Sequence, residues 1–438
     1  MTSSDRLRAG VIGLGWAGQQ HMAAYVDAAD VDLVALAGME TEALQKLGDA
    51  CGVPEEHRYA NWQDLVDHGQ RDVHLDLLSI AAPTTLHTPI AVAALDAGMH
   101  VLSEKPIAEN ADAARLMVEA AKRNDRVLDV SFNHRQRGHV KVLKKIIDAG
   151  LLGRIYYAKV GWLRREGIPG LGSWFTRRAT AGGGPLMDLG VHMLDIALHL
   201  LGEPPVRAVT AATYAEFGPR GKGSSLSPFM RKTGVEPGAF DVEDLSTAFL
   251  RLQDGGTLLL ESSWAQWIPK DRCYVTMYGS DGGASIEWGA PDDPDRTLDI
   301  WTEKKGVPAT LHPNIPPDGL HAESVRDFMM KVRSADYSNH RGKQALARAV
   351  VIDACYASAE KGTEVTLDSS EPQRCHISNV NLIVHLRVAV NVQQAMATCR
   401  RMEWSCLLPR HVPPTLGTGS GVFSALLWRS AFSAALQC

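Results

Sequence analysis

A glycine-rich turn between a strand and a helix limits the fold of this chain more than any other feature. The residues "LRAGVIG" near the N-terminus form an apolar run typical of a buried strand, and "AGQQHMAAYVDAA" follows with a helical pattern. Gly13, Gly15 and Gly18 mark the junction in the spacing G-x-G-x-x-G. The first permits a tight turn, the second lets a pyrophosphate approach the backbone, and the third allows close helix–strand packing. This context favours dinucleotide binding over the alternative, a glycine-rich turn in a domain that binds no nucleotide.

The alternation of strands and helices continues through residues 1–132. Apolar runs with strand character recur as "VDLVALAG", "LDLLSIAAP", "HVLSEKP" and "RVLDVSFN", and helical patterns lie between them. Such alternation predicts a doubly wound parallel sheet with helices on both faces and right-handed crossovers. We therefore expect an α/β fold whose first domain, residues 1–132, is an NAD(P)-binding Rossmann domain.

The pattern changes after Asn133. A helix at "GHVKVLKKIIDAG" leads to a strand at "RIYYAKVGWL", and after the helix of residues 185–200 a series of strands follows without helices between them. Gly and Asp turns join these strands, which predicts an open, mostly antiparallel sheet. Two further helices, at residues 322–334 and 342–362, are expected to pack against that sheet. Residues 133–367 form the expected second, α/β domain, for substrate binding and oligomerisation.

Residues 368–438 differ in composition from the rest of the chain. They contain no lysine and four of the seven cysteines. Six of their cysteines and histidines raise the question of zinc, but their spacings match no compact ligand pair, so we expect no metal. We interpret the segment as an atypical extension of poor order and assign it no function. The six residues are Cys375, His376, His385, Cys399, Cys406 and His411.

Charge and composition exclude several classes of partner. The net charge of −5 provides no general attraction to nucleic acid or to an anionic membrane. Seven sparse cysteines do not form the framework of a secreted disulfide-rich protein, and no uninterrupted apolar stretch reaches membrane-spanning length. We expect a cytoplasmic protein that binds a small molecule.

Lys105 is the first candidate for chemistry. It lies in "SEKPI", which follows the fourth predicted strand. Ligands bind at the carboxyl ends of strands in sheets of this kind, so the lysine would face the nicotinamide region. There it can polarise an oxygen or help to move its proton. The alternative is a surface lysine in a turn before proline.

A second candidate is the helix in "GGGPLMDLGVHMLDIALHLLG". Asp188 and His192 are four residues apart and share one helix face, which Asp195 and His199 extend. A carboxylate one turn from an imidazole can hold its tautomer and stabilise its cation. We interpret Asp195 and His199 as structural. The alternative for Asp188 and His192 is a polar stripe with a helix-capping aspartate.

The choice between NAD and NADP is left open by the second strand. The acid that binds ribose is expected about 20 residues after the glycine turn, but Gly38 occupies that position. Glu40, two residues later, could reach the ribose hydroxyls and would favour NAD. Lys46 is the nearest cation, and no arginine is placed to hold a 2′-phosphate.

Five motifs together resemble one known family. The segments "VIGLGWAG", "AAPTTLH", "GMHVLSEKPI", "GGGPLMDLGVHMLD" and "DVEDLSTAFLRLQDGGTLLLESSW" are similar to the glucose–fructose oxidoreductase / inositol dehydrogenase family, written Gfo/Idh/MocA. The similarity runs from about residue 7 to residue 367. It implies a Rossmann domain followed by an α/β domain whose sheet forms the contacts of a homodimer or homotetramer.

The resemblance also implies roles for individual residues. His192 would be the general acid/base, Lys105 would share its proton and contact cofactor and substrate, and Asp188 would orient substrate and His192. The implied cofactor-binding residues are Gly13, Leu14, Gly15, Trp16, Ala17, Gly18, Glu40, Ala82, Pro83, Thr84, His87, Glu104 and Lys105. The implied substrate-binding residues are Asn133, Arg135, Arg164, Arg165, Trp174 and Phe175.

These features predict an NAD(P)-dependent oxidoreductase acting on a sugar, cyclitol or related polyol. Hydride would pass between a hydroxyl-bearing carbon and nicotinamide, and Lys105 and His192 would handle the hydroxyl proton. Two alternatives stay open. One is a redox-neutral reaction, such as NAD-dependent glycoside cleavage or isomerisation, and the other is a regulatory protein that binds the cofactor without catalysis.

Overall fold

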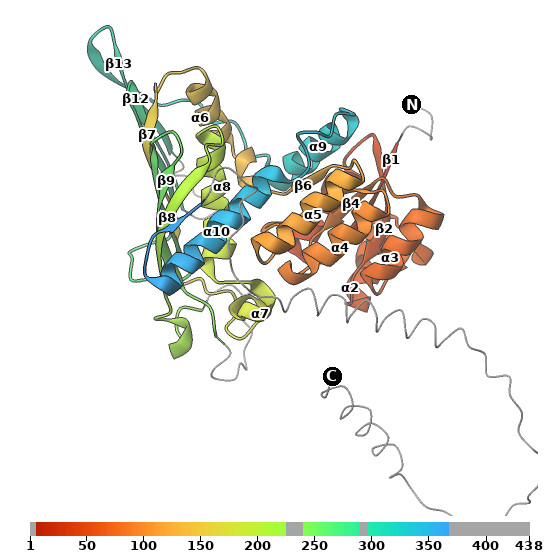
Figure 1. The fold of residues 1–438 in the computed structure, drawn as a ribbon. Helices are drawn as coiled ribbons and strands as arrows, with labels where there is room; N and C mark the ends of the chain where they lie inside the picture. The colour runs from red at the N-terminus through yellow and green to blue at the C-terminus, as the bar shows by residue number, and fades with distance from the viewer. Residues whose placement is uncertain (1–5, 225–239, 290–296, 368–438) are drawn as a thin grey trace, which may run out of the picture. The chain divides into compact units, whose positions relative to one another are not determined.

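The computed structural model describes residues 6–224, 240–289 and 297–367, all within one compact unit (Figure 1). Within these ranges no helix is long and apolar enough to cross a membrane. The extension of residues 368–438 and its cysteines and histidines lie outside the described residues, as do residues 225–239 and 290–296.

The first sheet is the predicted doubly wound parallel sheet. Its strand order among the described residues is β3-β2-β1-β4-β5-β6, and each neighbouring pair is parallel. The order reverses between β1 and β4, where such sheets open a crevice for a nucleotide. The short edge strand β3 was not predicted, because two residues show no periodicity. The strands are β1 (Leu7–Ile12), β2 (Val31–Ala37), β3 (Arg58–Tyr59), β4 (Leu77–Ile80), β5 (His100–Ser103) and β6 (Leu128–Val130).

Helices cover both faces of this sheet, and their ends follow local sequence signals. Asn110 caps α5 by accepting a hydrogen bond from the Ala113 amide, and Gly52 ends α2 in the left-handed conformation. The helix α1 has no side-chain cap. These helices are α1 (Trp16–Val26), α2 (Thr41–Cys51), α3 (Trp62–His68), α4 (Thr84–Asp96) and α5 (Ala111–Arg123).

The second sheet is mostly antiparallel, as expected. Its order in the described part of the chain is β14-β13-β12-β11-β7-β10-β9-β8-β15. The β7–β10 pair is parallel, and Trp162 pairs with Ser262 near the ends of both strands. Residues that follow β7 and β10 therefore emerge side by side. The strands are β7 (Ile155–Leu163), β8 (Val206–Tyr214), β9 (Leu245–Leu252), β10 (Thr257–Ser263), β11 (Arg272–Gly279), β12 (Gly282–Trp288), β13 (Thr297–Lys304), β14 (Val307–Leu311) and β15 (Val365–Thr366).

The last two helices pack differently from each other. The helix α10 (Lys343–Lys361) packs on β8, as expected, and also on α5. The helix α9 (Leu320–Arg333) packs on α1 instead, so the expectation that it covers the second sheet is wrong. The reason is its apolar face, since Val325 and Phe328 are fully buried in the core of the first sheet. The remaining helices are α6 (Gly138–Asp148), α7 (Arg178–Ala181) and α8 (Val191–Leu200).

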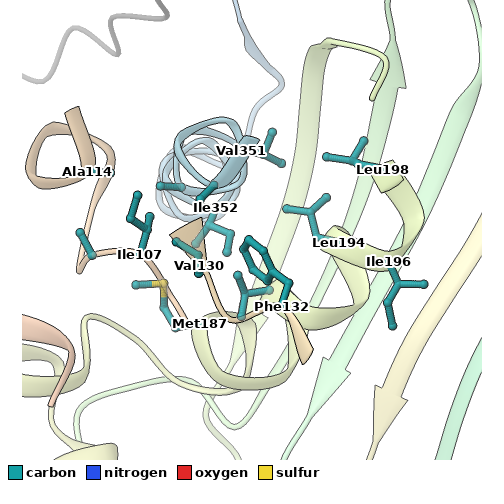
Figure 2. Close-up of a cluster of buried hydrophobic side chains, with 14 of the residues drawn as sticks. Ile107, Ala114, Val130, Phe132, Met187, Leu194, Ile196, Leu198, Val351 and Ile352 are labelled. Atoms are coloured by element: carbon teal, nitrogen blue, oxygen red, sulfur yellow. The ribbon is translucent and has the colours of Figure 1, made fainter. Parts of the chain in front are cut away.

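One hydrophobic core is continuous across both sheets. Figure 2 shows Phe132 and Val130, at the end of the first sheet, beside Leu194 of α8 and Ile352 of α10. All four are at least nine-tenths buried. Complete burial of such a side chain contributes about 1.5–3 kcal/mol. The core therefore holds α8 against residues 133–136, which follow β6, and against α10.

Candidate functional site

Lys105 and Asp188 meet although 83 residues separate them. Lys105 follows β5, and its Nζ lies 2.9 Å from Asp188 Oδ1 and 3.1 Å from the Asp188 carbonyl oxygen. Each side chain keeps about a fifth of its surface exposed, 18% and 19%. The ion pair thus joins the two sheets at a position that a small molecule can reach.

Asp188 lies on a π-helical turn, η6 (Leu186–Gly190), which precedes α8. We expected one regular helix. In a π-helical turn the backbone hydrogen bonds run from residue i to residue i+5, so a spacing of four residues does not align two side chains as it does in an α-helix. Glu243 stabilises the turn by accepting hydrogen bonds from the amides of Gly184 and Leu186. A Cβ on Gly184 would lie 2.1 Å from the Glu243 carbonyl oxygen, so glycine is required there.

Both carboxylate oxygens of Asp188 are engaged away from His192. Oδ1 accepts from Lys105, and Oδ2 accepts from Nε1 of the fully buried Trp264 at 2.9 Å. Burial favours the neutral acid, but the charges of Lys105 and Arg164 outweigh it and hold the pKa of Asp188 below its ordinary value. In the described residues Asp188 orients Lys105, and no hydrogen bond joins it to His192.

His192 is a buried imidazole on the first turn of α8. Its Nδ1 is sealed in the interior and has no hydrogen-bond partner among the described residues. Burial, and then the charge of Lys105, lower its pKa well below the ordinary value. The ring is consequently neutral at physiological pH and can accept a proton.

Glu104 fixes the segment that carries Lys105. Its carboxylate lies 3.1 Å from Nε2 of His21 on α1 and 3.5 Å from Nε2 of His321 on α9, and it also accepts from the Lys105 amide. Burial favours the neutral acid, but hydrogen bonds from both imidazoles outweigh it and hold the Glu104 pKa well below its ordinary value. Glu104 thus fixes the backbone at Lys105 through this hydrogen bond.

The glycine turn has the shape of a pyrophosphate cradle. Gly13 has φ +102°, and a Cβ there would lie 2.2 Å from the Ala81 carbonyl oxygen. A Cβ on Gly18 would lie 1.9 Å from the Gly13 carbonyl oxygen, whereas a Cβ on Gly15 would meet nothing within 4 Å. Since α1 lacks a side-chain cap, the first amides, at Trp16 and Ala17, are available to an anion. This arrangement fits a dinucleotide.

The residues after β4 form the opposite side of the crevice. Pro83 is exposed at the start of α4, and Thr84 is buried. Both ring nitrogens of the buried His87 lie 2.9 Å from carbonyl oxygens, Nδ1 from Pro106 and Nε2 from Ala82. His87 therefore connects this loop to the Lys105 segment through backbone contacts.

At the ribose end, Leu14 fills the space beside Gly38. A Cβ on Gly38 would lie 2.4 Å from the Leu14 side chain. Glu40 is exposed at the start of α2 and makes no capping hydrogen bond there. Its carboxylate is free to reach a ribose.

Two of the predicted substrate residues make hydrogen bonds with other side chains of the protein. Arg135 donates to both oxygens of the buried Asp195, which also accepts from Arg348. Asn133 donates through Nδ2 to Nδ1 of His321 at 3.2 Å. These contacts use the guanidinium of Arg135 and Nδ2 of Asn133, two residues that the resemblance had placed on the substrate.

The other four predicted substrate residues divide into two groups. Arg164 lies over the Trp162 ring, 5.3 Å from its centroid, and close enough to Asp188 to lower its pKa. Arg165 points elsewhere, to the carbonyl oxygens of Ile268 and Pro269. The rings of Trp174 and Phe175 form a stacked aromatic pair, with their centroids 3.8 Å apart.

Comparison with known proteins decides the family. A family described as "Oxidoreductase family, NAD-binding Rossmann fold" matches residues 7–132, and "GFO/IDH/MocA C-terminal domain" matches residues 140–285. The chain belongs to the Gfo/Idh/MocA family.

Several proteins that are similar to this member of the Gfo/Idh/MocA family are named as oxidoreductases of sugars. D-glucoside 3-dehydrogenase of Escherichia coli (strain K12) is 31% identical over 84% of this chain and 99% of its own length. Levoglucosan dehydrogenase of Pseudarthrobacter phenanthrenivorans is 29% identical over 66% of this chain and 75% of its own length. The crystal structure of aldose-aldose oxidoreductase from Caulobacter crescentus, complexed with glycerol, matches with a TM-score of 0.68 and 26% identity, over 83% and 100% of the two chains.

Sequence reasoning missed four residues of this Gfo/Idh/MocA site. His134 lies between Asn133 and Arg135, two of the implied substrate residues, and Trp264 ends the last motif of the resemblance. Both could have been found there. His21 and His321 carry no such signal, because only the packing of α1 against α9 brings them to Glu104.

Proposed function

We propose that this protein is an NAD(P)-dependent dehydrogenase that oxidises a secondary hydroxyl of a sugar, cyclitol or related polyol. The observation that carries the proposal is the 2.9 Å ion pair between Lys105, which follows the first sheet, and Asp188, on the turn that leads directly into the buried His192 of α8. A cation and a base at one partly open position are the groups that alcohol oxidation needs.

The two side chains divide the work. Bound NAD(P) would supply a nicotinamide ring that takes the hydride from the substrate carbon. His192 accepts the hydroxyl proton, for which its neutral ring is ready. Lys105 stabilises the negative charge that develops on the oxygen, and Asp188 holds the lysine in place.

We propose NAD as the preferred cofactor. The carboxylate of Glu40 would accept hydrogen bonds from the ribose hydroxyls and would repel a 2′-phosphate. The uncapped start of α1 and the open space at Gly15 support pyrophosphate binding.

We propose a D-glucoside as the substrate, oxidised at C3. The support is the 31% identity with D-glucoside 3-dehydrogenase along nearly all of that protein. Trp174, which is 37% exposed, and Phe175 offer an aromatic surface to the apolar face of a sugar ring.

Purified protein with NAD or NADP tests the proposal. The substrate panel is methyl β-D-glucopyranoside, levoglucosan and myo-inositol, and the readout is absorbance of the reduced nicotinamide. We expect reduction of NAD with the glucoside as the best substrate. Absence of reduction with every substrate would contradict the proposal, and product without net reduction would identify a redox-neutral reaction.

We also propose a cytoplasmic homo-oligomer that associates through the second sheet. Side chains alternate across a strand, so Leu259, Phe249 and Tyr157 lie on the face opposite the buried Leu258. These three apolar side chains are only partly buried, on a face that also carries Lys159 and Glu261, and a second copy of the chain would cover them. Light scattering should give the mass of a dimer or tetramer, and a monomer at micromolar concentration would contradict association.

The proposed cytoplasmic location agrees with the three free cysteines of the described part, because thiols stay reduced in the cytoplasm. Cell fractionation tests this location.

A further inference from the structure

A buried glutamate holds the backbone of the turn that carries Asp188. Glu243 comes just before β9 and is 7% exposed. Its carboxylate accepts hydrogen bonds from the Gly184 amide at 3.0 Å, from the Leu186 amide at 3.1 Å and from the Tyr356 hydroxyl of α10 at 2.8 Å. All three partners are donors. This set suits an ionised carboxylate, because a neutral acid would present a proton of its own to one of them.

The glycines before Pro185 allow the chain to approach this glutamate and this tyrosine closely. A Cβ on Gly183 would lie 2.0 Å from the Tyr356 hydroxyl oxygen, and a Cβ on Gly184 would lie 2.9 Å from the carboxyl carbon of Glu243. Neither position has room for a side chain. The glycine run therefore seats the turn against Glu243 and Tyr356, a role that the sequence motif alone does not reveal.

A short series of hydrogen bonds connects Glu243 with Lys105. Gly184, whose amide donates to Glu243, accepts through its carbonyl oxygen from the Asp188 amide at 3.1 Å. The Lys105 ammonium in turn donates to both the carbonyl oxygen and the carboxylate of Asp188. A shift of the turn therefore displaces an acceptor of the ammonium even where the Asp188 side chain can adjust.

The contacts around Glu243 require a carboxylate. Burial raises the pKa of Glu243, and the hydrogen bonds from the Leu186 and Gly184 amides and from Tyr356 act in the opposite direction. Burial, followed by the charge of Glu243, raises the pKa of Tyr356 well above its ordinary value, so the phenol keeps its proton and donates. In Glu243→Gln one acceptor oxygen becomes an NH₂ group that faces a donor.

We infer that Glu243 is a positioning residue for the proposed reaction, which sets the place of Lys105 by holding the backbone of the Asp188 turn. This inference rests on the proposed function. A carboxylate is costly to bury, so its three donors are needed to keep it in place. A displacement of about 1 Å at a reacting group can slow a reaction about 100-fold, so the position of the turn matters for the rate.

A double-mutant cycle tests the inference through the single-turnover rate of NAD reduction with methyl β-D-glucopyranoside. Glu243→Gln should slow the wild type about 10- to 100-fold but slow Lys105→Met less than about threefold, because it acts through that lysine. Tyr356→Phe removes one of the three donors and should slow the wild type about 2- to 10-fold. The matched control is Tyr337→Phe, which removes a phenol hydrogen bond to the Val332 carbonyl oxygen and should leave the rate unchanged.

A second readout needs no substrate. Acetic anhydride acetylates free amines, and the Lys105 ammonium is protected while it donates to Asp188. Mass spectrometry gives the rate of acetylation at Lys105 relative to that at the exposed Lys361 of the same chain. This ratio should rise at least about threefold in Glu243→Gln, because the displaced turn no longer holds the ammonium.

The possible results separate the inference from the proposed function. Equal slowing by Glu243→Gln in the presence and in the absence of Lys105 overturns the inference, and so does acetylation of Lys105 at the wild-type ratio. If the melting temperature shows that Glu243→Gln does not fold, both comparisons are made with Tyr356→Phe. If the wild-type protein reduces NAD with no substrate of the panel, the proposed function fails, and the acetylation ratio still decides whether Glu243 positions Lys105.

Discussion

At the scale of single residues, the charged side chains of the site keep their positions through hydrogen bonds with their neighbours. Trp264 is fully buried and donates one hydrogen bond to the carboxylate of Asp188, which in turn holds Lys105. Trp264→Phe keeps most of the volume and removes this bond, so the carboxylate can rotate away from Lys105. We expect kcat/KM to fall about tenfold, the cost of one hydrogen bond to a charged group. NADH affinity, measured by fluorescence, should not change, and unchanged kcat/KM would refute the positioning role.

Glu40 decides a different property, the choice of cofactor. Its exposed carboxylate is free to bond ribose and to repel a 2′-phosphate. In Glu40→Arg the repulsion becomes attraction, so we expect the ratio of kcat/KM for NADP to that for NAD to rise about 10- to 100-fold. Glu42→Arg, on the exposed surface of α2, is the matched control. An equal rise in both variants would assign the effect to general charge.

At the scale of elements, two glycines of the glycine turn have different roles, Gly18 in folding and in binding, and Gly15 in cofactor binding alone. Gly18→Ala places a Cβ 1.9 Å from a backbone oxygen, whereas Gly15→Ala places one in open space. We expect Gly18→Ala to lower both the melting temperature and the affinity for NADH. Gly15→Ala should keep the melting temperature and lose affinity at least tenfold, because the added methyl occupies the pyrophosphate position. Thermal unfolding and fluorescence titration check both, and normal NADH affinity in Gly15→Ala would contradict the cradle.

The pairing of β5 with its neighbour should make stability depend on pH. Nδ1 of His100 accepts from the Val127 amide at 3.0 Å, and burial, followed by the charge of Arg126, lowers the His100 pKa to about 4. The unfolded value is about 6.5. Between these values the unfolded chain binds more protons, so this contribution to stability falls as pH falls from 6.5 to 4. The melting temperature should drop less over this range in His100→Asn, whose amide does not titrate. Equal drops would refute the assignment.

Some elements could be predicted from the sequence and others could not. The pattern of apolar runs predicts β1, β2, β4, β5 and β6, because buried parallel strands are uniformly apolar. The π turn at Asp188 escaped prediction, since the Glu243 contacts that support it come from a segment far away in the sequence, just before β9. Likewise α9 has an ordinary amphipathic pattern, which does not reveal which sheet it covers.

At the scale of the whole molecule, the two sheets are joined by side chains that no local pattern relates. Asp195 was interpreted as structural from its place on the helix, and it does bind Arg135 and Arg348. Its partners come from the end of the first sheet and from α10, which meet only in the folded chain. Motifs therefore predicted Lys105, Asp188 and His192 as candidates, whereas the contacts of Asp188 with Trp264 and of His192 with His134 required the structure.

The central claim is that Lys105 and His192, from opposite halves, act on one substrate hydroxyl. The most direct measurement is the single-turnover rate of nicotinamide reduction with methyl β-D-glucopyranoside in the wild type, Lys105→Met and His192→Gln. We expect each variant to fall about 10²- to 10⁴-fold, the range for loss of a general acid or base, while NADH affinity stays within about threefold of the wild type. A rate within a few-fold of the wild type in either variant, with NADH bound normally, would contradict the claim.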